Sequence, residues 1–242
     1  MYMKKLLLFL FLFLFITGCD NREDKLIMVT EAGFAPYEYY SDGKIVGVDV
    51  DIAKEIAKEM GKKLVVKDVA FDSIITEVKC GKSDLGAAGI SYTKERAKQV
   101  DFSVDYTISK QVIVVRNDSN INNPNNLKNK KIGVQLGSIA DMYVTDEYPT
   151  NKIVRQKKYL AAIEDLKDNK VEAVVMDELP AKAILSENSG LKILNEPLAT
   201  DSYGIIVDKG NTELLNTINK VITRLKNEGK IDEFIINHTN NS

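Results

Sequence analysis

The sequence has few of the residues on which most catalytic and metal centres depend. Histidine occurs once, as His238 near the C-terminus, and cysteine occurs twice, as Cys19 and Cys80. These three residues provide no zinc-ligand spacing, no Ser-His-Asp set and no Cys-His pair. We therefore expect neither a metal site nor a hydrolase mechanism of these types, whereas chemistry based on carboxylates stays open.

Long runs of one charge and internal repeats are also missing. Lysine and arginine together number 33, aspartate and glutamate number 35, and the formal net charge is −2. Because both signs are mixed along the chain, it offers no polycationic surface for DNA or RNA. We therefore expect no nucleic-acid partner.

Apolar runs are short. The longest one, Leu6 to Ile16, has 11 residues and follows two lysines, whereas a bilayer span needs about 20. This pattern is typical of a signal peptide. The next residues, Thr-Gly-Cys (17–19), resemble the lipobox of bacterial lipoproteins, which predicts a signal peptide over 1–18 and a lipid such as palmitate on Cys19. The alternative is an ordinary secretory signal followed by an unrelated cysteine.

A lipid-anchored chain would work on the outer face of the cytoplasmic membrane, in the periplasm or outside the cell. Diffusible ATP and nicotinamide cofactors are not expected there, so no cofactor is predicted. Residues 19–24 are short, polar and charged, and we expect them to be a tether. Loss of 1–18 would move the net charge from −2 to −4. With Cys19 lipidated, Cys80 has no disulfide partner and is expected to be a small buried residue.

Strand-like and helix-like stretches alternate after the tether. The expected strands are 25–30, 64–69, 85–88, 112–115, 131–135, 153–155, 173–176 and 203–207. The expected helices begin at or just after the cap residues Asp49, Asp72, Thr93, Ser138 and Asn211, and at Tyr159, Glu178 and Ile231. This alternation predicts an α/β fold whose sheets are covered on both faces.

The β-α series occurs twice, with a late return to the first part. This predicts two lobes, each a mixed sheet flanked by helices, joined by a two-stranded hinge. The expected crossings lie near 109–115 and 201–207. Lobe one is then 25–110 with 204–242, and lobe two is 111–203.

Seven stretches of the sequence fit one known pattern in order and spacing. They are TEAGFAPYE (30–38), GVDVDIA (47–53), AFDSII (70–75), GISYTKERA (89–97), VDFS (100–103), KIGVQLGS (131–138) and AVVMD (173–177). With them the chain resembles the extracytoplasmic solute-binding proteins of polar amino-acid ABC importers, of the histidine-, glutamine- and arginine-binding type. The resemblance implies a periplasmic-binding-protein-like fold, a monomer without enzymatic activity, a free amino acid as ligand and a membrane permease as partner.

An amino acid carries a carboxylate and an ammonium group, and a selective pocket must satisfy both, because an unpaired buried charge is costly. Arg96 follows the cap Thr93, and its guanidinium can grip a carboxylate with two parallel bonds. The resemblance implies this role for Arg96, hydroxyl donation for Ser91 and a backbone carbonyl on the ammonium for Gly89. A solvated surface charge is the alternative for Arg96.

Further ligand contacts are expected where strands end. Asp177 follows an apolar strand, and the resemblance implies contact with the ammonium; its alternative role is a helix N-cap. Ser138 begins a helix, where a hydroxyl and free N–H groups can bind an anion. Gln135 matches a position that borders the pocket.

The ligand side chain is expected between two aromatic residues. The resemblance implies that Phe34 and Phe71 form flat walls and that Glu31 faces the end of the ligand side chain, while ordinary core packing is the alternative for both rings. An acidic group there favours arginine or another basic amino acid. Two other functions stay open: a secreted dehydratase of prephenate or arogenate type on the same fold, with Glu31 as acid, and a ligand-sensing module.

Overall fold

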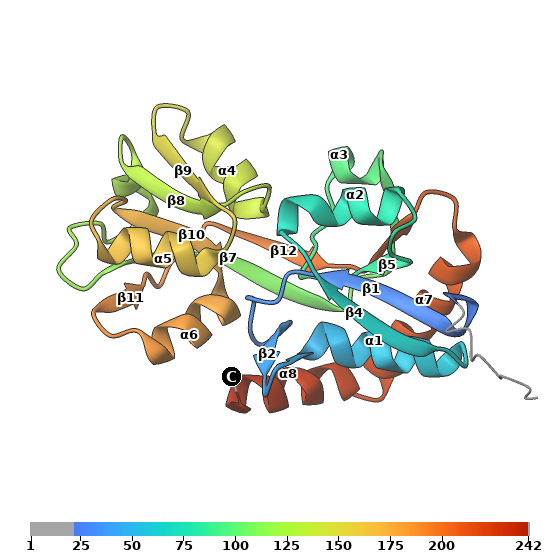
Figure 1. Ribbon diagram of the computed structural model, residues 1–242. Helices are drawn as coiled ribbons and strands as arrows, with labels where there is room; N and C mark the ends of the chain where they lie inside the picture. The colour runs from blue at the N-terminus through green and yellow to red at the C-terminus, as the bar shows by residue number, and fades with distance from the viewer. Residues whose placement is uncertain (1–21, 242) are drawn as a thin grey trace, which may run out of the picture.

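The structure is a computed structural model that describes residues 22–241. The predicted signal peptide, the lipidation site Cys19 and the first half of the predicted tether lie outside the described residues. Figure 1 shows two α/β lobes side by side, each with its own central sheet. The predicted fold class is confirmed.

The first sheet has five strands in the order β4-β1-β5-β13-β6. Strand β1 is parallel to β4 and β5, whereas β13 is antiparallel to β5 and β6. The strands are β1 (Lys25–Thr30), β4 (Lys63–Asp68), β5 (Leu85–Gly86), β6 (Val100–Phe102) and β13 (Ile206–Asp208). The helical elements are η1 (Arg22–Asp24), α1 (Val48–Glu59), η2 (Phe71–Ser73), α2 (Ile74–Lys79), α3 (Lys94–Ala97), α7 (Thr212–Asn227) and α8 (Lys230–Asn241). A hairpin of β2 (Tyr39–Ser41) and β3 (Lys44–Val46) lies beside this sheet.

The second sheet has six strands, in the order β11-β7-β10-β8-β9, with β12 also paired to β7. The strands are β7 (Thr107–Arg116), β8 (Lys131–Gln135), β9 (Lys152–Gln156), β10 (Ala173–Asp177), β11 (Leu191–Ile193) and β12 (Ala199–Tyr203). The helical elements are η3 (Pro124–Leu127), α4 (Ile139–Glu147), α5 (Tyr159–Lys167) and α6 (Glu178–Glu187).

The sequence of β10 begins with four apolar residues in a row because both faces of this strand are buried. Side chains of a strand alternate between the two faces of a sheet. Ala173 and Val175 belong to the cluster that contains Val144 of α4, whereas Val174 and Met176 belong to the cluster that contains Ile163 of α5. Helices therefore cover both faces of the second sheet, as an all-apolar strand predicts.

Two segments connect the lobes. The chain leaves the first sheet after Phe102 and returns to it at Ile206, and the crossing segments are joined by the bonds Ser103 N–Ile205 O and Tyr106 N–Tyr203 O, both 2.9 Å. In Figure 1, β7 and β12 run next to each other between the lobes, and they pair antiparallel. The predicted strand 203–207 is interrupted at residues 204 and 205, where β12 ends and β13 has not begun.

Two predicted helix caps are wrong. Helix α1 begins at Val48, because Gly47 adopts a φ of 136° and a Cβ there would lie 2.0 Å from the carbonyl oxygen of Tyr37. Asp49 is therefore inside the helix, fully buried, rather than its cap. Asp72 lies within η2, which precedes α2.

Cys80, which was expected to be buried, is exposed. It is the C-cap residue of α2, a helix that buries Ile74 and Val78 instead. Among residues 22–241, no helix is both long and apolar enough to cross a bilayer. In the same part of the chain, no group of three or more His, Cys, Asp or Glu residues could hold a metal ion.

Candidate functional site

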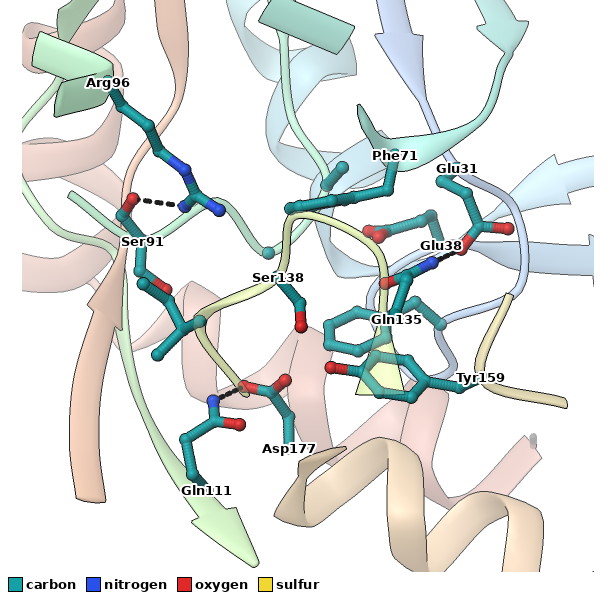
Figure 2. A pocket seen from close by; sticks show the side chains of 14 residues that line it. Glu31, Glu38, Phe71, Ser91, Arg96, Gln111, Gln135, Ser138, Tyr159 and Asp177 are labelled. Carbon is teal, nitrogen blue, oxygen red and sulfur yellow. Dashed lines mark hydrogen bonds between the residues drawn. The ribbon is translucent and has the colours of Figure 1, made fainter. Parts of the chain in front are cut away.

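One pocket is lined by residues of both lobes, close to the ends of β1, β5, β8 and β10. The space between its side chains, counted together with adjoining open solvent, is about 320 Å³, and Figure 2 shows these side chains. All nine predicted ligand residues line it: Glu31, Phe34, Phe71, Gly89, Ser91, Arg96, Gln135, Ser138 and Asp177. It is also lined by Glu38, Ala88, Gln111, Ile139 and Tyr159. The structure therefore brings the predicted residues together, and their contact with a ligand stays a prediction.

Arg96 is buried, with 4% of its surface exposed. Thr93 caps α3 by accepting from the Arg96 backbone N–H, as predicted. The guanidinium donates to the carbonyl oxygens of Ser91 (2.6 Å) and Gly137 (2.9 Å) and lies 5.6 Å from the centre of the Phe71 ring. Burial lowers its pKa to about 10, and nearby carboxylates oppose that effect, so Arg96 is charged at neutral pH. The described bonds use two of its five N–H donors.

Asp177 is the last residue of β10 and occupies the N-cap position of α6, but its side chain makes no cap bond. Its Oδ1 instead accepts from Ser109 Oγ at 2.8 Å, from Gln111 Nε2 at 2.7 Å and from the Tyr203 hydroxyl. Burial raises the pKa of Asp177 to about 7, and the negative charge of Asp201 adds to the effect. The carboxyl is therefore fixed by three donors from the hinge strands.

Asp201, on β12, was not predicted. It accepts from the Ser91 hydroxyl and, at 3.4 Å, from Gln111 Nε2. Burial raises its pKa as well. The Ser91 hydroxyl, which was expected to donate to a ligand carboxylate, thus donates to Asp201. Asp201 is 110 positions away from Ser91, and no local pattern in the sequence connects them.

Gly89 lines the pocket. Its N–H donates to Asp49 Oδ2 at 3.0 Å. Its φ is +54°, and a Cβ would lie 2.6 Å from Cε1 of Phe34, so glycine is required here. Asp49 and Glu38 are both buried, and burial raises the pKa of both, that of Asp49 to about 6, while the charge of Asp49 raises the pKa of Glu38 further. Two buried carboxyl groups that repel each other are not readily ionised together, so we expect the pair to hold about one proton.

Aromatic rings form part of the pocket wall. Phe34 is buried and stacks on Tyr159, with 5.9 Å between ring centres and 23° between planes. Phe71 lies beside Arg96. Tyr159 was expected only as the start of a helix; it is the first residue of α5, and its ring reaches the pocket from lobe two.

Glu31 is buried, with 2% of its surface exposed, and has partners from the other lobe. Its Oε2 accepts from Gln135 Nε2 at 3.1 Å, a bond drawn in Figure 2, and its Oε1 lies 3.0 Å from Lys158 Nζ. Burial raises the pKa of Glu31, although Lys158 opposes the shift. Gln135 also donates to the carbonyl of Lys157 at 3.0 Å. Lys158 was not predicted.

Ser138 caps α4, as predicted. Its hydroxyl oxygen accepts from the Asp141 N–H at 3.1 Å. The hydroxyl proton can still point towards an anion, since the cap bond uses only the oxygen as acceptor.

Several proteins of known name are similar to this chain. The arginine-binding extracellular protein ArtP of Bacillus subtilis is 31% identical over 222 residues, which cover 90% of this chain and 87% of ArtP. The structure of AbpA, an amino acid ABC transporter substrate-binding protein from Streptococcus pneumoniae bound to L-arginine, matches with a TM-score of 0.86 and 34% identity over 90% of this chain and 95% of AbpA. An ancestral arginine-binding protein bound to glutamine matches with a TM-score of 0.82 and 40% identity, covering 87% of this chain and 96% of the ancestral one.

The sequence profile of one family extends over almost all of the described residues. It matches positions 26–240, which include both lobes, the hinge and every residue of the pocket. The predicted family is confirmed, and it is one of binding proteins that act outside the cytoplasm. The chain belongs to the bacterial extracellular solute-binding proteins, family 3.

Proposed function

We propose that this protein binds one free L-amino acid with a positively charged side chain, with arginine as the best fit, and delivers it to an ABC permease. The observation that carries the proposal is the distribution of charge around the pocket. Arg96 and Asp177 are buried at one end, and Glu31 and Glu38 are buried at the other. The arginine-binding relatives support the same ligand class.

The charges at the first end match the two charges that every amino acid carries. Arg96 would bind the ligand carboxylate with charge-assisted bonds, and Asp177 would accept from the ammonium group. Burial raises the pKa of both Asp177 and Asp201, and the charge of Asp201 raises that of Asp177 further, to about 7, so the two carboxyls together carry less than two negative charges near pH 7. Positive and negative charge therefore both face the ligand backbone.

The second end keeps a negative charge. Lys158 offsets Glu31, while Glu38 and Asp49 are expected to hold about one proton and so keep about one charge. A guanidinium or ammonium group at the end of the ligand side chain would offset that charge, which favours arginine over neutral amino acids. The flat faces of Phe34 and Tyr159 suit its aliphatic stem and its planar tip.

Contacts between the lobes support capture by hinge closure. Arg96 reaches the Gly137 carbonyl, and Glu31 contacts both Gln135 and Lys158, so groups of both lobes meet at the pocket. A ligand held by both lobes binds the closed arrangement better than the open one and shifts the population towards it.

We also infer that Cys19 carries lipid, that 1–18 is a signal peptide and 19–24 a tether, and that the protein is a monomer with lobes 25–110 plus 204–242 and 111–203. The Thr-Gly-Cys sequence at 17–19 supports the anchor. Cys19→Ser should move the protein from the membrane fraction to the soluble fraction of expressing cells. A variant that stays with the membranes would contradict lipidation at Cys19.

A thermal-shift screen of the folded protein against all common amino acids, ornithine and citrulline tests the ligand class. A ligand at a hundred times its Kd stabilises by about 2.7 kcal/mol, which is easily measured. We expect the largest shift with arginine and smaller shifts with ornithine and lysine. A shift with glutamate alone, or with no amino acid, would contradict the proposal.

A further inference from the structure

Lys158 forms an ion pair across the cleft at the end of the pocket that would hold the ligand side chain. Its Nζ lies 3.0 Å from Glu31 Oε1 and 3.9 Å from Asp68 Oδ2. Both carboxylates belong to lobe one, whereas Lys158 follows β9 and is the N-cap residue of α5 in lobe two. The next residue, Tyr159, enters the pocket. The backbone of Lys158 is therefore fixed beside the site.

The two partners of this ion pair differ in burial. The side chain of Glu31 is 2% exposed and that of Lys158 is 45% exposed. A carboxyl as deeply buried as Glu31 stays ionised only beside a positive partner, and otherwise takes up a proton. Lys158 is such a partner, and Gln135 adds a neutral donor. The negative charge of Glu31 is thus already offset by the protein itself.

We propose that Lys158 determines how strongly the site prefers cationic over neutral ligand side chains, by offsetting the charge of Glu31 from the opposite lobe. This inference rests on the proposed amino-acid binding. With Lys158 present, Glu31 accepts a neutral amide almost as well as a cation. Without Lys158, the ligand itself must supply the positive charge, so arginine gains relative to a neutral analogue of the same shape.

Arginine and citrulline test this, because they differ in one charge and hardly in shape. The measurement is the ratio of the citrulline Kd to the arginine Kd, by calorimetry and, for weak citrulline binding, by competition against arginine. In Lys158→Met this ratio should rise at least about tenfold over the unaltered protein, because the removed charge lies beside a buried carboxylate but is partly screened by solvent.

Lys167→Met is the matched control. Lys167 ends the same helix and pairs with Glu164 at 3.0 Å, but Glu164 is 52% exposed and outside the pocket. The ratio should change less than about twofold there, as expected for an exposed ion pair. The double variant Glu31→Gln/Lys158→Met should also differ less than about twofold in this ratio from the single variant Glu31→Gln. The reason is that both lack the carboxylate that Lys158 offsets.

The outcomes separate the two proposals. If the unaltered protein binds neither arginine nor any other amino acid, the proposed function fails. If it binds arginine and the ratio is the same in Lys158→Met as in the unaltered protein, or rises equally in Lys167→Met, then the role of Lys158 is overturned while amino-acid binding stands. A ratio that rises equally with and without Glu31 would also overturn it.

Discussion

The two ends of the pocket are built differently. At the end that would hold the ligand backbone, Arg96 and Asp177 are each fixed by hydrogen bonds to backbone carbonyls or to hinge side chains. At the other end, Glu31 is fixed mainly by Gln135 and Lys158, which come from the opposite lobe. Arg96 and Asp177 are therefore each held mainly within their own lobe or by the hinge, and only one bond, from Arg96 to the Gly137 carbonyl, crosses the cleft. Glu31 instead takes its partners from the opposite lobe. General affinity should depend on the first end and ligand choice on the second.

The largest effect should follow from the loss of Arg96. Arg96→Met removes the cation that would make two charge-assisted bonds to the ligand carboxylate, worth about 1.5–3 kcal/mol each. Calorimetry should show at least about a hundredfold weaker binding of every amino-acid ligand, with the ranking of ligands kept.

Lys94→Met gives the control for this change. Lys94 is an exposed residue on the same short helix, so replacing it removes an equal charge without altering the pocket. Its binding should match the unaltered protein. Unchanged arginine affinity in Arg96→Met, with a folded protein by circular dichroism, would refute the assignment of the first end.

Asp177→Asn should have the next largest effect. The amide keeps an oxygen that can accept from Ser109, Gln111 and Tyr203, but it loses the charge that attracts the ligand ammonium. Arginine and citrulline should both bind about ten- to a hundredfold more weakly, because both carry the same ammonium group. Calorimetry with the two ligands checks this. A loss confined to arginine would place Asp177 at the side-chain end and break the comparison.

The same difference between contacts within a lobe and contacts between lobes explains which site residues could be predicted from the sequence. Gly89, Ser91, Gln135, Ser138 and Asp177 stand at strand ends or helix starts, where parallel strands direct their following residues to one edge. The alternation of strands and helices therefore predicted the α/β fold, and the resemblance to amino-acid-binding proteins pointed to the nine residues that line one pocket.

Contacts between distant segments left no such pattern. Lys158 is one of many lysines, and its pairing with Glu31 depends on how the lobes meet. Asp201 likewise meets Ser91 only through the hinge. The sequence around Asp49 is typical of a helix N-cap. The helix nevertheless begins earlier, at Val48, because Gly47 occupies the N-cap position.

Gly89 packs closely against Phe34 in the pocket wall, and a pair of alanine variants measures how much stability this close packing contributes. Gly89→Ala and Gly43→Ala both put alanine at positive φ, 54° and 72°, which costs about 1–2 kcal/mol. At Gly43 a Cβ meets no atom within 4 Å, whereas at Gly89 it would lie 2.6 Å from Phe34. This overpacking adds about 1–3 kcal/mol, so thermal unfolding should show a lower Tm for Gly89→Ala by about 2–12 °C. Equal Tm values would mean that the contact with Phe34 relaxes freely.

The smallest expected effect is a proton released at the side-chain end. Burial raises the pKa of Glu38 well above its ordinary value and that of Asp49 to about 6, so the pair holds a proton that a nearby guanidinium would displace. Arginine binding at pH 7 should therefore release more protons than citrulline binding, by up to about one, and the affinity for arginine relative to citrulline should rise with pH above about 6.

Calorimetry in buffers of different ionisation enthalpy measures this difference. Asp177, whose pKa burial raises to about 7, also releases a proton when an ammonium group binds, but it does so equally for both ligands and cancels in the comparison. Glu38→Gln should abolish the excess release with arginine. If the excess persists in that variant, the displaced proton belongs to another group, and Glu38 does not contact the charged tip of the ligand. Ligand choice would then rest on Glu31 and its partner Lys158 alone.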